Sequence, residues 1–246
     1  MGWRKIERID FVFKDKVVVI TGGANGIGKC IKEEFAKQNA KCYVIDIQDG
    51  EHFVGDISNK DTLEEFAKYV ISKEGHIDFL INNAPPLFKG INTCSYEEFN
   101  KALAVGVTAP FYLSKLFMNN FNEGGVIINI SSSRDRMSQP QSESYTASKG
   151  AIAALTHSLA VSLAHKVRVN SISPGWINTD PTSTFEDMDH LQHPSGRIGK
   201  VEDIASLVLF LCSSKASFIN GENIVVDGGM TKQMIYHNDH NWILKK

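Results

Sequence analysis

The sequence alternates between short β-branched apolar runs and longer stretches with helical periodicity, and this alternation constrains the fold more than any other feature. Seven runs have the length and branching of buried strands, at residues 16–21, 41–46, 52–55, 77–82, 126–131, 167–173 and 223–226. Helical stretches occur at residues 28–39, 61–73, 96–119, 145–165 and 201–212, with a kink expected at Pro110. This order predicts a doubly wound α/β fold: a mostly parallel seven-stranded sheet with helices on both faces.

No repeat, low-complexity tract or linker interrupts the pattern, so we predict one domain over residues 1–246. Within it we expect an N-terminal extension at residues 1–14 and a C-terminal tail at residues 231–246. The polar, irregular stretch at residues 179–197 is the candidate substrate lid. Such a lid is short, which favours a small or open substrate site.

Charge and cysteine content exclude several classes of protein. The 26 Lys and Arg against 28 Asp and Glu give a formal net charge of −2, which argues against a nucleic-acid partner. No apolar run approaches the roughly 18 residues that a membrane span needs. The four cysteines are scattered without a C-x-x-C pair, which favours a reducing cytoplasm. We predict no metal site, because no carboxylate or cysteine is placed with His190 and His193.

A glycine-rich turn joins the first strand to the first helix. Residues 21–28 (TGGANGIG) place Gly22, Gly26 and Gly28 where a backbone must turn tightly and approach a pyrophosphate at a helix N-terminus. Asp46 ends the second strand, 20 residues after Gly26. A carboxylate there accepts hydrogen bonds from adenosine ribose hydroxyls and repels a 2′-phosphate, so the sequence favours NAD over NADP.

A tyrosine and a lysine stand four residues apart on the helix predicted at 145–165. This spacing puts Tyr145 and Lys149 on one helix face. A nearby ammonium lowers the pKa of a phenol, which makes Tyr145 a plausible general acid/base. The strand at 126–131 runs into three serines, and Ser132 lies 13 residues before Tyr145.

These motifs, in this order, resemble the short-chain dehydrogenase/reductase family over about residues 14–230. The shared motifs are TGGANGIG (21–28), GDI (55–57), NNA (82–84), NISS (129–132), YTASK (145–149), PGWINT (174–179) and VDGG (226–229). The resemblance implies a Rossmann-type sheet and hydride transfer between a nicotinamide and a secondary alcohol or ketone. It also implies a homodimer or homotetramer, and the small residues of the 145–165 helix would permit close packing between subunits.

The resemblance assigns roles residue by residue. Tyr145 would be the acid/base, Lys149 would bind the nicotinamide ribose and lower the pKa of Tyr145, and Ser132 would bind the reacting oxygen. The implied cofactor contacts are Gly22, Asn25, Gly26, Ile27, Gly28, Asp46, Asp56, Ile57, Asn83, Ala84, Tyr145, Lys149, Pro174, Gly175, Ile177 and Thr179. The rival functions are an NADPH-dependent carbonyl or ketoacyl reductase and a catalytically impaired dinucleotide-binding sensor.

The sequence departs from the family pattern in two places. Pro85 follows the NNA motif where the family has glycine, and Gly106 stands where the family has a catalytic asparagine. Either the enzyme is disabled, or a backbone carbonyl and a water carry the proton instead, which Gly106 and Pro110 would permit. Because Ser132, Tyr145 and Lys149 remain, we favour an active enzyme.

The substrate side is less defined by sequence. Arg134 follows the serines and is either an anion-binding residue of the substrate pocket or a solvated surface side chain. Glu143 would balance that charge or bind a substrate hydroxyl. Sugar, steroid, hydroxy-acid and acyl-thioester substrates all remain open.

Overall fold

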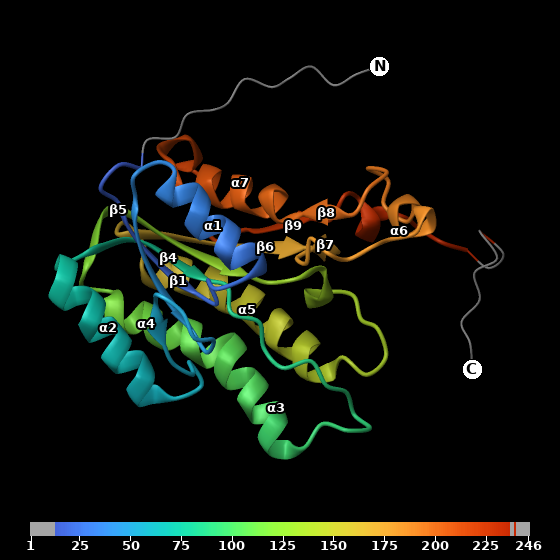
Figure 1. Cartoon of the computed structure of the whole chain (residues 1–246), viewed down its shortest axis with the longest axis horizontal. Helices are drawn as coiled ribbons and strands as arrows, with labels where there is room; N and C mark the ends of the chain where they lie inside the picture. The colour runs from blue at the N-terminus through green and yellow to red at the C-terminus, as the bar shows by residue number, and fades with distance from the viewer. Residues whose placement is uncertain (1–12, 237–238, 240–246) are drawn as a thin grey trace.

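A seven-stranded parallel sheet forms the centre of the computed structural model, which describes residues 13–236 and 239 (Figure 1). The strand order is β3-β2-β1-β4-β5-β6-β9, and every neighbouring pair is parallel. The strands are β1 (Val17–Thr21), β2 (Lys41–Asp46), β3 (Phe53–Val54), β4 (Ile77–Asn82), β5 (Phe121–Ile130), β6 (Val167–Pro174) and β9 (Asn223–Val226). The predicted fold class and all seven predicted strands are confirmed.

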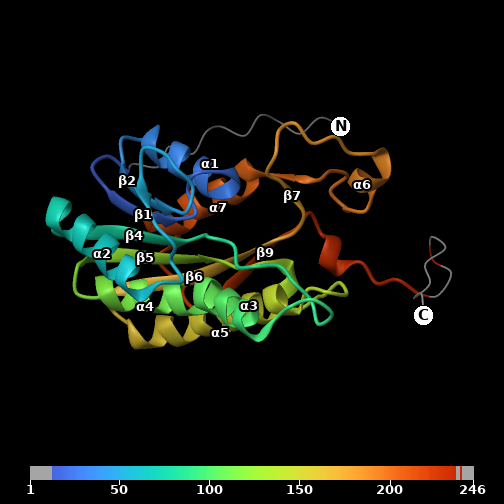
Figure 2. The same cartoon turned by 60° about the horizontal axis from the view of Figure 1, so that its bottom comes forward.

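Helices cover both faces of the sheet (Figures 1 and 2). One face carries α1 (Gly26–Ala36) and α7 (Val201–Cys212); the other carries α2 (Lys60–Glu74), α4 (Ala109–Phe117) and α5 (Glu143–Ser162). Alternate residues of β1 face these two layers: Val18 and Ile20 pack with α1 and α7, whereas Val17 and Val19 pack with α2 and α4. Each such fully buried aliphatic side chain stabilises the fold by about 1.5–3 kcal/mol.

The long helix expected at 96–119 is continuous but contains a π-helical turn. It consists of α3 (Tyr96–Leu103), η1 (Ala104–Thr108) and α4, which ends at Phe117. The amide of Ala109 donates to the carbonyl of Ala104, five residues back. Pro110 follows directly and has no amide hydrogen to donate to Gly106, so the proline and the wide turn occur together.

Element boundaries differ from the sequence prediction in two informative ways. Helix α1 begins at Gly26 rather than Gly28, so the helix N-terminus lies inside the glycine-rich turn. Strand β5 begins five residues early, at Phe121, because Phe121 pairs with Ile77 across an irregularity in the β4–β5 register.

The candidate lid has short secondary structure of its own. It contains α6 (Asp187–Leu191), and it is flanked by β7 (Ile177–Asn178) and β8 (Gly199–Lys200), which pair with each other. Figure 1 shows this segment beyond the carboxyl ends of the strands. The strand order reverses between β1 and β4, and a doubly wound sheet binds its ligand in the crevice at that switch point.

The predicted N-terminal extension (1–14) and C-terminal tail (231–246) lie largely outside the described residues. Within residues 13–236 and 239, none of the helices combines the length and the hydrophobicity that crossing a membrane demands.

Candidate active site

A cleft of about 860 Å³ opens at the carboxyl ends of the strands. It is lined by most of the residues predicted from sequence: Gly22, Asn25, Gly26, Ile27, Asp46, Asp56, Ile57, Asn83, Ala84, Ser132, Tyr145, Lys149, Pro174, Gly175, Ile177 and Thr179. Gly28, Arg134 and Glu143 are not among the lining residues. The volume is within the usual range for a small-molecule or cofactor site.

The start of α1 presents unoccupied amides to this cleft. Its N-cap residue, Asn25, makes no side-chain cap hydrogen bond, and its side-chain nitrogen donates to Gln48 Oε1 at 2.6 Å. The uncapped N–H groups and the helix dipole favour an anion. Gly28 must lack a side chain, because a Cβ there would lie 2.1 Å from the carbonyl oxygen of Gly22. Gly28 thus shapes the turn without lining the cleft.

Asp46 is fixed before any ligand binds. Its Oδ2 accepts the amide hydrogen of Ala24 at 3.0 Å, and its Oδ1 accepts that of Gln48 at 3.1 Å. The next residue, Ile47, is 70% exposed and lines the cleft. A carboxylate followed by an uncharged side chain suits two ribose hydroxyls and offers no cation to a 2′-phosphate.

Asp56 has a partner that sequence reasoning missed. Lys101 of α3 donates to its Oδ2 at 2.9 Å, and both residues line the cleft. Burial raises the pKa of Asp56, but hydrogen bonds from Lys101 and Ser58 outweigh burial and hold the pKa below its ordinary value. The carboxylate is therefore ionised and oriented.

Ser132, Tyr145 and Lys149 meet at the other end of the cleft. The hydroxyl of the neighbouring Ser131 donates to the Lys149 carbonyl at 2.9 Å, so its proton is engaged. Ser132 Oγ accepts the amide hydrogen of Arg134 at 3.2 Å, and its hydroxyl forms a hydrogen bond with Tyr145. Lys149 Nζ lies 5.3 Å from the centre of the Tyr145 ring and donates to the Ile130 carbonyl at 2.7 Å.

The two ionisable groups have shifted pKa values. Burial lowers the pKa of Lys149 from 10.5 to about 7. Burial also raises the pKa of Tyr145, while hydrogen bonding with Ser132 and the charge of Arg134 act to lower it. Perturbed groups that share one cleft are typical of an active site.

The chain is similar over most of its length to known proteins. A family model described as Enoyl-(Acyl carrier protein) reductase matches residues 22–231. An uncharacterized oxidoreductase of Thermotoga maritima is 38% identical, over 92% of this chain and 99% of that protein. The NAD-dependent glycerol dehydrogenase of Listeria innocua is 32% identical, over 90% and 96%. A solved apo SCOR enzyme from Clostridium thermocellum is 44% identical with a TM-score of 0.86, over 95% and 99%.

The chain belongs to the short-chain dehydrogenase/reductase family. It is therefore an oxidoreductase of a family that uses NAD(P)(H). The residues that line the cleft extend from Gly22, directly after β1, to Thr179, directly after β7.

The space beside Gly106 is bounded by Pro86, the residue that follows Pro85. A Cβ on Gly106 would lie 2.8 Å from the Cβ of Ser148 and 3.2 Å from Pro86. Ser148 is held in place, since its single hydroxyl hydrogen is shared between the carbonyls of Ser144 and Ala102, at 2.9 and 3.1 Å from Oγ. The second proline after the NNA motif thus takes the space that the family asparagine would need.

Glu143 anchors a loop. Its Oε2 accepts the amide hydrogen of Ile91 at 3.0 Å. The next residue, Ser144, donates to the Leu87 carbonyl and accepts from the Lys89 amide, both at 2.9 Å. The segment after β4 is thereby tied to the start of α5, next to Tyr145.

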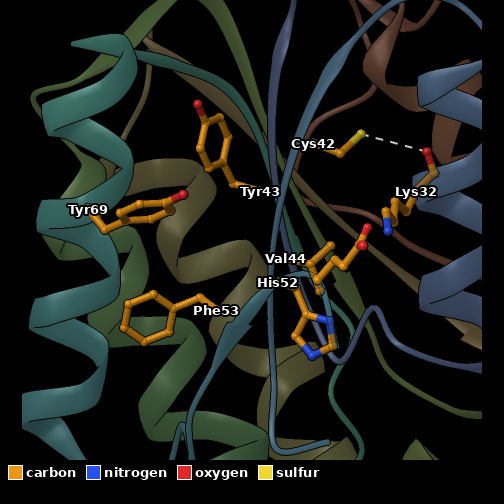
Figure 3. A pocket seen from close by; sticks show the side chains of 8 residues that line it. Lys32, Cys42, Tyr43, Val44, His52, Phe53 and Tyr69 are labelled. Carbon is orange, nitrogen blue, oxygen red and sulfur yellow. Dashed lines mark hydrogen bonds between the residues drawn. The ribbon is translucent and has the colours of Figure 1, made fainter. Parts of the chain in front are cut away.

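A second, smaller pocket of about 340 Å³ is lined by residues of β2 and of the edge strand β3 (Figure 3). Tyr43, Phe53 and Tyr69 lie on the α2 side of the strand, and Cys42 lies on the α1 side. Burial raises the pKa of Cys42 to about 11, and its thiol donates to the Lys32 carbonyl at 3.6 Å. A protonated thiol is a poor nucleophile, so this pocket offers no comparable chemistry.

Proposed function

We propose that the protein is an NAD-dependent oxidoreductase that interconverts a secondary alcohol and a ketone, with Tyr145 as general acid/base. One observation carries the proposal: Ser132, Tyr145 and Lys149 meet at one end of a cleft whose other end presents Asp46 and the uncapped start of α1. The first group suits a reacting C–OH, and the second suits the diphosphate and ribose of a dinucleotide.

During oxidation, Tyr145 accepts the hydroxyl proton while the C–H bond of the same carbon breaks. Ser132 accepts the Arg134 amide hydrogen and bonds with Tyr145, and with a substrate bound its hydroxyl would donate to the substrate oxygen instead. A bound nicotinamide supplies the acceptor for the hydride, which carries two electrons. During reduction, Tyr145 returns a proton to the carbonyl oxygen.

Lys149 would hold the nicotinamide ribose and, when protonated, favour the tyrosinate. The proton path then passes the π-helical turn. Because Pro110 has no amide hydrogen, it cannot satisfy the Gly106 carbonyl four residues before it, and that carbonyl is suited to bind a water. A water at Gly106 would replace the family asparagine in the relay to solvent.

The cofactor preference rests on Asp46. Its carboxylate is held by two backbone amides and would repel a 2′-phosphate. The name of the Listeria relative, an NAD-dependent glycerol dehydrogenase, supports the same preference.

The substrate is a small molecule whose class the cleft restricts only in part. Beside Tyr145 the lining is apolar, with Pro85, Pro86, Leu87 and Val105. These side chains favour substrates with an apolar flank next to the reacting carbon.

A screen of secondary alcohols tests the proposal. Polyols, steroids and hydroxy acids are offered with NAD⁺ and NADP⁺, and reduced cofactor is followed by absorbance. We expect turnover of at least one alcohol with a higher kcat/KM for NAD⁺. A preference for NADP⁺ would favour the carbonyl or ketoacyl reductase, whereas cofactor binding without turnover would favour the sensor.

We also propose that the enzyme is a homodimer or homotetramer in the cytoplasm. Large apolar side chains on the outer helices are exposed, among them Phe111 of α4 at 45% and Val161 of α5 at 77%, and a subunit neighbour would cover them. The four cysteines are all free thiols, as a reducing compartment requires. Light scattering of the purified protein tests the assembly.

A further inference from the structure

An arginine without a counter-charge stands beside the catalytic tyrosine. Arg134 lies in the short turn η2 (Ser133–Asp135), directly after Ser132. Its guanidinium carbon is 4.7 Å from the centre of the Phe88 ring, and the Phe88 ring centre is 5.5 Å from that of Tyr145. One terminal nitrogen donates to Gln139 Oε1, and the other, Nη1, is buried with no hydrogen-bond partner among the described residues.

The neighbouring arginine shows what Arg134 lacks. Arg136 makes two bonds to the carboxylate of Asp135, at 2.9 and 3.0 Å. That carboxylate also accepts from Ser173 at 3.1 Å and from Asn223, so it is fully engaged elsewhere. Within residues 13–236 and 239, no carboxylate forms an ion pair with Arg134. An unpaired charge in a half-buried position is costly, and its retention beside an acid/base indicates a role in the chemistry.

Charged groups from three elements surround Tyr145. On its own helix, Lys149 faces the ring and Glu143 is bound to the Ile91 amide. The segment after β4 carries Lys89, which is paired with Glu98. The turn after β5 carries Arg134 and the mutually paired Asp135 and Arg136. Of the cations, Arg134 and Lys149 are the two without a carboxylate partner in the part of the chain described.

These two cations differ in how permanent their charge is. Because burial lowers the pKa of Lys149 to about 7, its ammonium is only partly protonated near neutral pH. A guanidinium stays protonated at every pH at which the protein is folded. Burial raises the pKa of Tyr145, and Arg134 is the charged group whose effect lowers that pKa.

We propose that Arg134 is a positioning residue for the reaction: its guanidinium, held by Phe88 and Gln139, stabilises the tyrosinate form of Tyr145 that accepts the proton of an alcohol. The role of Arg134 in alcohol oxidation rests on the proposed function. Its effect on the pKa of Tyr145 does not depend on a substrate. Arg134 is not among the residues that line the cleft, and Phe88 contacts both it and Tyr145. This placement favours action on the tyrosine over direct binding of an anionic substrate.

A titration of Tyr145 tests the effect without any substrate. Tyrosine-ring NMR signals are followed against pH with NAD⁺ bound and without it, and the Tyr145 signal is assigned by its loss in Tyr145→Phe. We expect Arg134→Gln to raise the midpoint by about one pH unit, at the low end of the shift that a nearby opposite charge produces. Arg134→Lys keeps the charge and should restore most of the shift.

The matched control is Arg136→Gln, which removes the same charge two residues away, from an arginine that is already paired. In this variant the titration midpoint of Tyr145 should equal that of the parent protein. Equal midpoints for Arg134→Gln and the parent would overturn the proposal. A shifted midpoint in a protein that oxidises no alcohol would support the effect on Tyr145 and overturn only the proposed function.

The pH profile of alcohol oxidation provides the kinetic readout. In Arg134→Gln the rise of kcat with pH should occur at a pH about one unit higher than in the parent. At pH values below the rise, kcat should therefore be about tenfold lower than in the parent, and at high pH the two profiles should converge. A uniform loss of kcat at all pH values would overturn the proposal. So would a rise in KM restricted to acidic substrates, which would make Arg134 an anion-binding residue instead.

Discussion

The two halves of the cleft are built in different ways. The cofactor half consists of a glycine-rich turn, a helix start and Asp46, and its key contacts join segments close in sequence or on adjacent strands. The substrate half depends on contacts between distant segments: Gly106 with Pro86 and Ser148, and Arg134 with Phe88. The first half follows the family pattern, and the second departs from it.

This difference indicates which features of the cleft must be kept between relatives and which can vary. A pyrophosphate needs backbone amides and room, so its site is fixed by glycines and by one acid at the end of a strand. The substrate half has no such universal ligand. There, the missing side chain of Gly106 leaves room for Pro86 and Ser148, and the site is defined by mutual fit.

Among substitutions that distinguish the two halves of the cleft, the largest effect is expected at Asp46. Asp46→Ala should lower kcat/KM for NAD⁺ by about a hundredfold, because two hydrogen bonds to a charged group are lost at about 1.5–3 kcal/mol each, in part replaced by water. The NADP⁺/NAD⁺ ratio of kcat/KM should rise, while KM for the alcohol should stay nearly constant. Initial rates with both cofactors measure this. An unchanged ratio would remove Asp46 from cofactor selection.

In the substrate half, Gly106→Ala should destabilise the fold by about 1–3 kcal/mol, as overpacking does in a tight core. Its Cβ would meet Ser148 and Pro86. The matched control is Gly150→Ala in α5, where the nearest atom to a new Cβ is 3.8 Å away and helix propensity favours alanine. Urea unfolding measures both variants. Equal stability changes would show that Gly106 is not sterically constrained.

The buried Lys149 predicts how stability depends on pH. Its pKa is about 7 in the folded protein and near 10.5 when unfolded, so between these values the unfolded chain binds the extra proton. The free energy of unfolding should therefore rise with pH through this window. Lys149→Met should flatten the rise, and Lys68→Met, at an exposed site on α2, should not. If the free energy of unfolding has the same slope against pH in the parent and in Lys149→Met, the assignment of a buried, neutral Lys149 is wrong.

The smallest effect is expected at Glu143, which anchors the segment after β4 through one hydrogen bond to Ile91. Glu143→Gln keeps an acceptor at this position and should change kcat by less than about threefold. Glu143→Ala should cost about 0.5–1.5 kcal/mol of stability. A large rise in KM for hydroxylated substrates with either variant would instead make Glu143 a substrate contact, as the sequence had suggested.

The sequence predicted the sheet and the cofactor half because their signals are local: β-branched runs, a glycine-rich turn and an acid at the end of a strand. The four-residue spacing on one helix also predicted the Tyr145–Lys149 pair, and the family resemblance added Ser132. It missed the Lys101–Asp56 pair and the Pro86–Gly106 contact, because each joins segments that only the folded chain brings together. Arg134 and Glu143 were noticed, but the sequence could not show that Phe88 and Ile91 would engage them.

The most direct test of the account separates cofactor binding from proton transfer in Tyr145→Phe. NADH binding is measured by fluorescence titration, and turnover is measured with the best alcohol from the screen. We predict that the Kd for NADH stays within about threefold of the parent while kcat falls by about 10²–10⁴-fold, the usual contribution of a general acid/base. An unchanged kcat would contradict the assignment of Tyr145 and, with it, the proposed function.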